Sequence, residues 1–549
     1  MPNRTPHPAL PFPESARIDD DVKTVRVFVF AGQSNMVGSD SKAGDIRKFP
    51  PFAGLDRPQN NVWFSYVLGR EEKRKSNGWV PLAPIDNVVG PELSFARTVA
   101  RETGAPIAII KCAAGGTTLG GDWNPENPTG FKLYPLALDL VRASLAELKR
   151  RGIPHRVEGV VWHQGENDMF DPAMRVRYGP NLRAFVDRWR RDLGVPDLRF
   201  QIGELCTKTI WGMDNRENMY AIRAGQKAVA DTDPRIEYVP TSHHAVEIGG
   251  DAGLHYHYGT LGQLEHGEAH ADCYLRSIGK SRVAARPLRP WPFPRGGKVT
   301  LFVLTGHRNM EGERAFAAEL GRVRGAAALA KDNPRIAFRQ SIGGGVKQSA
   351  DWEPLGPAGL HGTFGPELSF GSTLARGFRG NIAIAKFTHS GSQTNDWTPQ
   401  GTSAIDRNLY PSFIAFVRKA VEDLRAKGHT VEIAGVFHHV GENDMAFSPY
   451  RRNCAKWLAQ WIAASRIDLA EPTLRWFLSQ QPPAVGRGLE AIDPVADIAA
   501  LAAADPAVIP LPHTDLPRQP EALVLDTAGV VALGERLARA ALATIGNSR

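Results

Sequence analysis

One serine stands where a hydroxyl nucleophile could work. Ser34 follows the mostly apolar run Val25–Phe30 and precedes a segment expected to be helical. That order places its side chain in a strand-to-helix turn, near backbone N–H groups and the positive end of a helix dipole. The position suits a nucleophile whose attack generates an oxyanion, and the alternative role is that of a helix N-cap.

A group of histidines raises the possibility of a metal site or a general base. The group comprises His243, His244, His255, His257, His266 and His270. No H-E-x-x-H or comparable spacing occurs among them, and the four cysteines of the chain lie singly. We therefore expect no metal site and no disulfide framework. The tract Gly343–Gly345 lacks a following Lys-Ser/Thr, which argues against a phosphate-binding loop, and no cofactor is expected.

Short β-branched runs alternate with longer amphipathic stretches in the first half. Predicted strands cover Val25–Phe30, Ile107–Ile110, Val157–Trp162, Leu198–Ile202 and Ile236–Val239, and predicted helices cover Glu92–Arg101, Leu136–Arg150 and Asn181–Leu193. Strands that are apolar almost throughout are typical of parallel sheets covered on both faces. The pattern predicts an α/β three-layer sandwich with mainly parallel strands, which binds ligands at the carboxyl ends of its strands.

Three blocks of the first half return in the second half in the same order. The segment around Ser34 returns around Arg308, Gly90–Phe95 returns at Gly365–Phe370, and Gly165–Met169 returns at Gly441–Met445. The offsets are 308 − 34 = 274, 365 − 90 = 275 and 441 − 165 = 276. An offset this constant indicates a tandem duplication of one domain. We predict an N-terminal extension (1–23), a first domain (24–285), a Pro-rich linker (286–298) and a second domain (299–549).

Three motifs of the first half resemble those of the SGNH (GDSL-like) hydrolases, and specifically the sialate O-acetylesterase-like carbohydrate esterases. Gly32-Gln33-Ser34-Asn35-Met36 is similar to the nucleophile block of the family. Lys111–Thr117 is similar to the block that supplies an oxyanion-hole glycine, and Trp162–Asp168 matches the His-Gln-Gly-Glu block. The resemblance implies two tandem SGNH-type α/β/α domains.

The resemblance also implies a role for each matching residue. Ser34 would attack the acetyl carbonyl, and Glu166 would orient the catalytic histidine. The oxyanion would be held by the backbone N–H groups of Ser34 and Gly116, together with the side chain of Asn167 or Gln164. A structural ion pair is the alternative role for Glu166, and its retention as Glu442 in the second half favours that alternative.

The histidine is assigned by its spacing to two glycines. His257 precedes Gly262 and Gly267 by five and ten residues, and Val524 in the second half precedes Gly529 and Gly534 by the same steps. This spacing favours His257 over His255 as the general base. The sequence departs from the family at Leu254 and Gly259, where aspartates are usual. Asp251 with His255 therefore remains an alternative pair.

The second half retains the architecture and loses the chemistry. Arg308 stands at the position of Ser34, Val440 at that of Gln164 and Val524 at that of His257, whereas Gly391, Glu442 and Asn443 persist. We expect a catalytically inactive copy retained for packing, for shaping the cleft or for binding glycan.

The predicted function is that of a serine esterase that removes O-acetyl groups from a carbohydrate or a small acetyl ester. An O-acetyltransferase with the same triad and a non-catalytic glycan-binding protein are the alternatives. The net charge of +8 is spread over 549 residues without a Lys/Arg block, so a nucleic-acid partner is not expected. No run is long enough to span a membrane and the N-terminus lacks a secretory pattern, which predicts a cytoplasmic protein.

Overall fold

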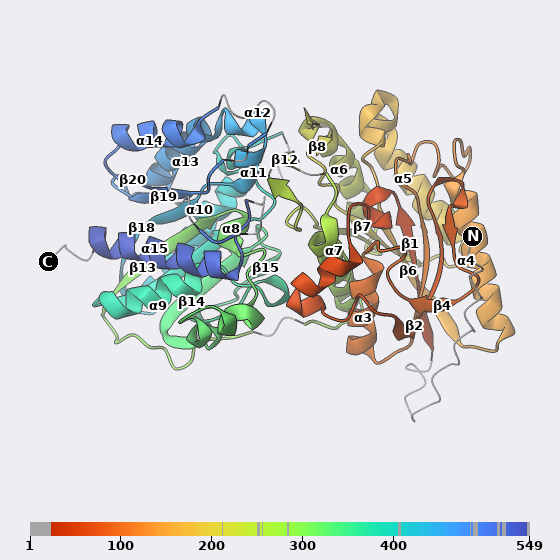
Figure 1. Cartoon of the computed structure of the whole chain (residues 1–549), viewed down its shortest axis with the longest axis horizontal. Helices are drawn as coiled ribbons and strands as arrows, with labels where there is room; N and C mark the ends of the chain where they lie inside the picture. The colour runs from red at the N-terminus through yellow and green to blue at the C-terminus, as the bar shows by residue number, and fades with distance from the viewer. Residues whose placement is uncertain are drawn as a thin grey trace. The chain divides into compact units, whose positions relative to one another are not determined.

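The computed structural model describes residues 24–210, 212–249, 253–254, 256–282, 285–403, 408–483, 485–486, 492–512, 516–518 and 523–545. The chain forms two compact units, coloured red to green and green to blue in Figure 1. The first unit comprises residues 1–246 and 256–282, and the second comprises 247–255 and 283–549. Among the described residues, no helix is both long and apolar enough to cross a membrane.

The first unit is built on an eight-stranded sheet. Its order is β10-β7-β6-β1-β5-β2-β3, and β4 also pairs with β2. The strands are β1 (Val25–Gly32), β2 (Gln59–Leu68), β3 (Arg74–Lys75), β4 (Val80–Leu82), β5 (Ile107–Ala113), β6 (His155–His163), β7 (Arg199–Gly203) and β10 (Ile236–Val239). From β10 to β2 along this order, every pair of neighbouring strands is parallel. The short strands β3 and β4 run antiparallel to β2. Every residue of the central strand β1 is buried.

Helices cover both faces of this sheet. They are α3 (Glu92–Thr103), α4 (Leu133–Arg150), α5 (Pro172–Leu193), α6 (Arg216–Asp231) and α7 (Gly259–Ser277). Figure 1 shows the sheet between α3 and α7 on one side and α4 and α5 on the other. The start of α5 illustrates the local cause of these boundaries, because Asp171 caps it by accepting hydrogen bonds from Ala173 N and Met174 N.

The second unit repeats this architecture. Its sheet has the order β15-β14-β17-β13-β18-β19-β20, with β16 also paired to β14. The strands are β13 (Lys298–Gly306), β14 (Asn333–Ile342), β15 (Lys347–Gln348), β16 (Glu353–Leu355), β17 (Asn381–Thr388), β18 (Thr430–His439), β19 (Trp476–Gln480) and β20 (Val508–Pro512). The main helices are α9 (Glu367–Gly377), α10 (Leu409–Ala426), α13 (Cys454–Asp468), α14 (Pro494–Ala504) and α15 (Thr527–Ile545).

The duplication extends to irregularities of the backbone. The pairing of β1 with β6 shifts register between Val27 and Phe28, and the pairing of β13 with β18 shifts at the corresponding pair, Leu301 and Phe302. The predicted fold of two tandem α/β domains with mainly parallel sheets is confirmed. The strand prediction omitted β2, which opens with the polar residues Gln59-Asn60-Asn61 before its apolar part begins.

The Pro-rich segment between the two repeats is packed onto the second unit. Leu288 N donates a hydrogen bond to Trp352 O at 2.8 Å, and Trp291 Nε1 donates to His429 Nε2 at 2.8 Å. Phe293 is buried. These contacts make the segment part of the second unit, although the prolines still interrupt regular secondary structure.

Candidate active site

Ser34 begins a one-turn helix, α2 (Ser34–Val37), directly after β1. The turn is tied to the neighbouring strand β6, because Gln33 N donates a hydrogen bond to His163 O at 3.1 Å. Ser34 is half-buried, and neither its hydroxyl nor its amide N–H has a hydrogen-bond partner among the described residues. The position therefore offers an unengaged hydroxyl beside an unengaged backbone donor.

A glycine loop after β5 lies against this turn. Gly116 has a left-handed φ of +70°, and a Cβ atom there would lie 1.8 Å from Nη2 of Arg70. Arg70 holds the loop by donating from Nε to Gly115 O at 2.8 Å and from Nη2 to Gly116 O at 3.1 Å. The left-handed backbone thus favours glycine at position 116, and the absence of a side chain there leaves room for the guanidinium of Arg70.

Asn35 connects the serine turn to the backbone on both sides of His257. Its Nδ2 donates to Tyr256 O at 3.4 Å, and its Oδ1 accepts from Tyr258 N at 3.3 Å. The same Nδ2 donates to Glu166 Oε1 at 2.7 Å. One buried amide therefore fixes the segment that carries His257 relative to Ser34.

His257 is paired with a carboxylate that the sequence analysis did not single out. Its Nδ1 lies 2.6 Å from Oδ2 of Asp40, and its side chain is almost fully buried. Asp40 adopts a left-handed φ of +61° in the loop that follows α2. A non-glycine residue in this conformation is uncommon, and such residues cluster at functional sites.

Glu166 occupies a different environment. Its Oε1 accepts from Asn35, and its Oε2 has no hydrogen-bond partner among the described residues. Burial raises the pKa of this carboxyl to about 7. The structure thus brings Glu166 to Asn35, and it brings Asp40 to His257. The alternative pair of Asp251 and His255 lies outside the described residues.

The two candidate amides for the oxyanion hole differ in how they are engaged. Gln164 is fully buried, and its Nε2 donates to Thr117 O at 2.9 Å and to Asp168 Oδ2 at 2.6 Å. Asn167 is half-buried and accepts at Oδ1 from Gln33 Nε2 at 3.1 Å, while its Nδ2 has no partner among the described residues. Both Nε2 hydrogens of Gln164 are therefore used in buried hydrogen bonds, whereas the Nδ2 group of Asn167 can still donate.

A row of buried histidines, His163, His266 and His270, adjoins the serine turn through the backbone oxygen of His163. Burial lowers the pKa of His163 to about 3, and that of His270 to about 3 as well. His270 Nε2 lies 3.0 Å from His266 Nε2, so the two rings share one hydrogen. Within the described part of the chain, no group of three or more His, Cys, Asp and Glu side chains is arranged to hold a metal ion.

A cavity of about 300 Å³ opens beside these residues. It is lined by Val37, Ser39, Asp40, Leu68, Gly69, Lys73, Arg74, Val88 and Gly115. Asp40 connects the cavity to His257, and Gly115 connects it to Ser34, since a Cβ on Gly115 would be in van der Waals contact with the serine. Lys73 and Arg74 give one wall a positive charge. Arg74 pairs with Asp86 at 3.2 Å.

The second unit shows the same frame around different side chains. Asn309 Nδ2 donates to Leu523 O at 3.1 Å, and its Oδ1 accepts from Leu525 N at 2.7 Å. These bonds enclose Val524 as those of Asn35 enclose His257. Gly267 and Gly534, from which the spacing was counted, also occupy equivalent places. A Cβ on Gly267 would lie 2.0 Å from Pro91 O, and a Cβ on Gly534 would lie 2.2 Å from Pro366 O, the equivalent proline. His257 and Val524 are therefore structurally equivalent.

The serine position of the second unit is filled by a buried ion pair. The guanidinium of Arg308 pairs with Glu313, and both side chains are 2% exposed. Arg308 Nε also donates to Asn443 Oδ1 at 3.1 Å, and Arg308 N donates to Glu442 Oε2 at 3.0 Å. Asn443 Nδ2 donates to Ser392 O at 2.9 Å. The backbone N–H of Arg308 and the Nδ2 of Asn443 are therefore engaged, whereas the equivalent donors of Ser34 and Asn167 have no partner among the described residues.

Comparison of the two halves of the sequence could have pointed to Asp40 as a functional residue. The offset of 274 places Arg314 at the position of Asp40, so serine, aspartate and histidine are all replaced in the second unit. Glu166 is instead retained as Glu442. A side chain that persists where serine, aspartate and histidine are all replaced is more easily explained by folding than by catalysis.

A family model matches each half of the chain, and several known proteins resemble part of it. The family model "carbohydrate esterase, sialic acid-specific acetylesterase" matches residues 24–276 and again 298–543. A probable carbohydrate esterase of Arabidopsis thaliana is 28% identical over 205 residues, which is 34% of this chain and 72% of that protein. An X-ray structure of an Arabidopsis thaliana protein has a TM-score of 0.35 and 20% identity over 46% of this chain and 98% of its own. A carbohydrate acetylesterase from Xanthomonas citri has a TM-score of 0.32 and 18% identity over 48% and 58% of the two chains.

Proposed function

The chain belongs to the carbohydrate esterase family of sialic acid-specific acetylesterases, with one family domain in each half, and from this premise we propose that the first unit is a serine acetylesterase. The observation that carries the proposal is the Asp40–His257 pair, held beside the Ser34 turn by Asn35. A hydroxyl nucleophile, an imidazole and a carboxylate that orients the imidazole form the constellation required for acyl transfer.

In this mechanism Ser34 Oγ attacks the acetyl carbonyl carbon and His257 takes the hydroxyl proton. Because Nδ1 of His257 faces Asp40, the proton is taken at Nε2, and Asp40 holds the Nδ1–H tautomer and stabilises the imidazolium. The tetrahedral intermediate collapses when His257 returns the proton to the sugar oxygen. Water then attacks the acetyl-Ser34 ester with His257 as base, and acetate leaves.

The developing oxyanion is stabilised by three donors. They are the backbone N–H groups of Ser34 and Gly116 and the Nδ2 hydrogens of Asn167. Asn167 is preferred over Gln164, because the hydrogens of Gln164 are already used in buried bonds. Gln33 orients Asn167 through the bond from its Nε2. Loss of one such donor typically lowers kcat by about 10²–10³.

We propose that Glu166 supports the fold of the site and that Asp40 is the acid of the triad. A triad carboxylate must be ionised in order to stabilise an imidazolium, and burial holds the pKa of Glu166 near 7. Asp40 is about half exposed and in direct contact with the imidazole.

The proposed substrate is an O-acetylated acidic sugar such as an acetylated sialate. Lys73 and Arg74 line the cavity between Asp40 and Gly115, where the sugar would lie while its acetyl group meets Ser34. Arg74 is neutralised by Asp86, whereas Lys73 has no ion-pair partner among the described residues, and its ammonium favours a carboxylate-bearing sugar over a neutral one.

Acetate release from O-acetylated N-acetylneuraminate and from acetylated neutral sugars tests this function. Wild-type protein should release acetate from the acidic substrate with the higher kcat/KM, and the Ser34→Ala variant should release none. Lys73→Ala should reduce the preference for the acidic substrate while preserving hydrolysis of 4-nitrophenyl acetate. Absence of acetate release from every ester would contradict the proposed esterase.

A further inference from the structure

The second unit contains a cavity between strand β14 and helix α10. Its volume is about 350 Å³, and we name it the β14–α10 pocket after the elements that supply most of its lining. The lining residues are Arg339, Ser341, Gly344, Gly345, Gln348, Phe387, Ser412, Ala415, Phe416 and Lys419. The volume is that of a site for a small molecule.

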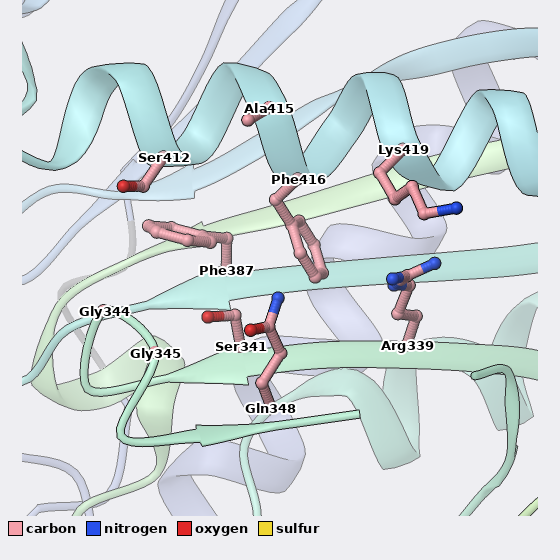
Figure 2. A pocket seen from close by; sticks show the side chains of 10 residues that line it. All are labelled: Arg339, Ser341, Gly344, Gly345, Gln348, Phe387, Ser412, Ala415, Phe416 and Lys419. Atoms are coloured by element: carbon pink, nitrogen blue, oxygen red, sulfur yellow. The ribbon is translucent and has the colours of Figure 1, made fainter. Parts of the chain in front are cut away.

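The side chains divide this pocket into a cationic end and a hydroxyl-bearing end. Figure 2 shows Arg339 and Lys419 together at one end, with Ser341, Phe387 and Ser412 toward the other. Phe416 lies between them, and the Arg339 Cζ is 5.8 Å from its ring centroid. Gly344 and Gly345, which belong to the glycine tract noted in the sequence, form part of the pocket wall without contributing side chains.

Two buried polar atoms of the lining lack hydrogen-bond partners within the described chain. They are Nε of Arg339 and Oγ of Ser341, on side chains whose residues are 5% and 1% exposed. A buried donor or hydroxyl without a partner costs about 1–3 kcal/mol. A bound ligand that supplies acceptors at these two points would remove that cost.

The charges at the cationic end do not cancel. Asp423 accepts from Lys419 Nζ at 2.5 Å and also pairs with Arg339 Nη1. One carboxylate therefore faces two cations, and the Lys419 side chain is 57% exposed, so its ammonium retains donors for a ligand. The net charge of +1 favours an anion.

The first unit lacks the features that make this pocket. Ser65 pairs with Ile110 in the first sheet, and Arg339 pairs with Ala385, the equivalent of Ile110, in the second. Ser65 is therefore the counterpart of Arg339. By the same register, Val67 is the counterpart of Ser341. The shared Leu-Tyr-Pro at the start of α4 and α10 makes Ala143 the counterpart of Lys419. In the first unit, Ser65 Oγ bonds Ser144 Oγ at 3.0 Å instead. The two cations and the Ser341 hydroxyl, which has no partner among the described residues, are thus not present at the matching positions of the first unit.

We propose that the β14–α10 pocket binds an acidic monosaccharide. Its carboxylate would lie between Arg339 and Lys419, its hydroxyls would meet Ser341 and Gln348, and the apolar face of the ring would pack on Phe416. Aromatic rings provide such a surface, and guanidinium matches the geometry of a carboxylate. The second unit is then a sugar-binding module. This inference does not depend on the activity of the first unit.

Calorimetric titration of the full chain with glucuronate, and with glucose as the neutral probe, tests this proposal. The decisive variant is Ser341→Val with Lys419→Ala, which introduces the residues of the first unit at both positions. We expect saturable binding of glucuronate, much weaker binding of glucose, and a loss of at least about tenfold in affinity, or about 1.4 kcal/mol, in the double variant. Its hydrolysis of 4-nitrophenyl acetate and its Tm should match those of the wild type.

Two controls separate this pocket from other cationic surfaces. Lys456→Ala removes an exposed lysine from α13 and should leave glucuronate binding unchanged. Lys73→Ala removes a cation from the cavity of the first unit. Binding that is lost with Lys73→Ala but retained in the double variant would overturn the proposal, as would equal affinity for glucose and glucuronate or the absence of saturable binding.

Discussion

Oδ2 of Asp40 lies 2.6 Å from Nδ1 of His257, although 217 residues separate them in the chain. This contact is the basis for proposing Asp40 as the acid of the triad. Asp40 makes this contact from the loop after α2, where its backbone is left-handed.

The first prediction compares the two candidate acids. Asp40→Asn should lower kcat on 4-nitrophenyl acetate by about 10²–10⁴, because an amide no longer enforces the required tautomer of His257. Glu166→Gln should lower it less than about tenfold. Asp187→Asn, which changes an exposed ion pair on α5, is the control and should be silent. A larger loss for Glu166→Gln than for Asp40→Asn would restore Glu166 as the triad acid.

The second prediction concerns the number of reactive serines. A fluorophosphonate should label the chain once, at Ser34, because the second unit has a buried Arg308–Glu313 pair at the equivalent place. Ser34→Ala should abolish labelling and change the free energy of unfolding by no more than about 0.5 kcal/mol, since the hydroxyl makes no bond with the described residues. Peptide mapping locates the label, and urea denaturation measures the free energy of unfolding. Label beyond residue 298 in the Ser34→Ala protein would show that the second unit is active.

The third prediction uses the duplicated asparagine as a matched pair. Asn35→Ala and Asn309→Ala each remove bonds to the backbone around the equivalent residues His257 and Val524. Both should lower the free energy of unfolding, by about 1–3 kcal/mol each. Only Asn35→Ala should lower kcat, since only that segment carries a base. Equal kcat for the two variants would mean that Asn35 does not position His257.

The fourth prediction concerns the ion pair that fills the second site. Arg308→Met should lower the free energy of unfolding by at most about 3–5 kcal/mol, because buried Glu313 loses its closer cation and keeps only the longer contact with Arg314, at 3.7 Å. Adding Glu313→Gln should recover part of the loss. Urea denaturation of the single and double variants measures the difference. If the double variant is less stable than Arg308→Met alone, the pair is not the source of the destabilisation.

The fifth prediction follows from the raised pKa of Glu166. The folded state keeps this carboxyl protonated up to a pKa of about 7, whereas the unfolded state releases the proton near 4.5. The folded state thus binds more protons between these values, and the contribution of Glu166 to stability falls as pH rises through this window. The change is up to about 3 kcal/mol.

Thermal unfolding from pH 4 to 8 tests this dependence. The Tm of Glu166→Gln relative to wild type should increase as pH rises from about 4.5 to 7 and then stay constant. A Tm difference that is the same at every pH would show that Glu166 ionises in the folded state as it does in solvent.

Several features of the protein follow from the sequence alone. The duplication is visible as a constant offset of repeated blocks. The α/β fold follows from apolar strand runs that alternate with amphipathic helices. The equivalence of His257 and Val524 follows from their equal spacing to two glycines. These glycines pack closely against a neighbouring backbone, which leaves no room for a side chain. They therefore keep their positions when the surrounding side chains change.

Other features were decided only by the tertiary structure. The pairing of Asp40 with His257, the commitment of Gln164 to buried bonds and the cavity between β14 and α10 each join segments distant in the chain. Spacing within one segment does not report such contacts, since they depend on loop conformation and on which polar atoms burial leaves without partners. The sequence therefore determined which backbone positions meet at the end of the sheet, and the folded structure determined which side chain each of them meets.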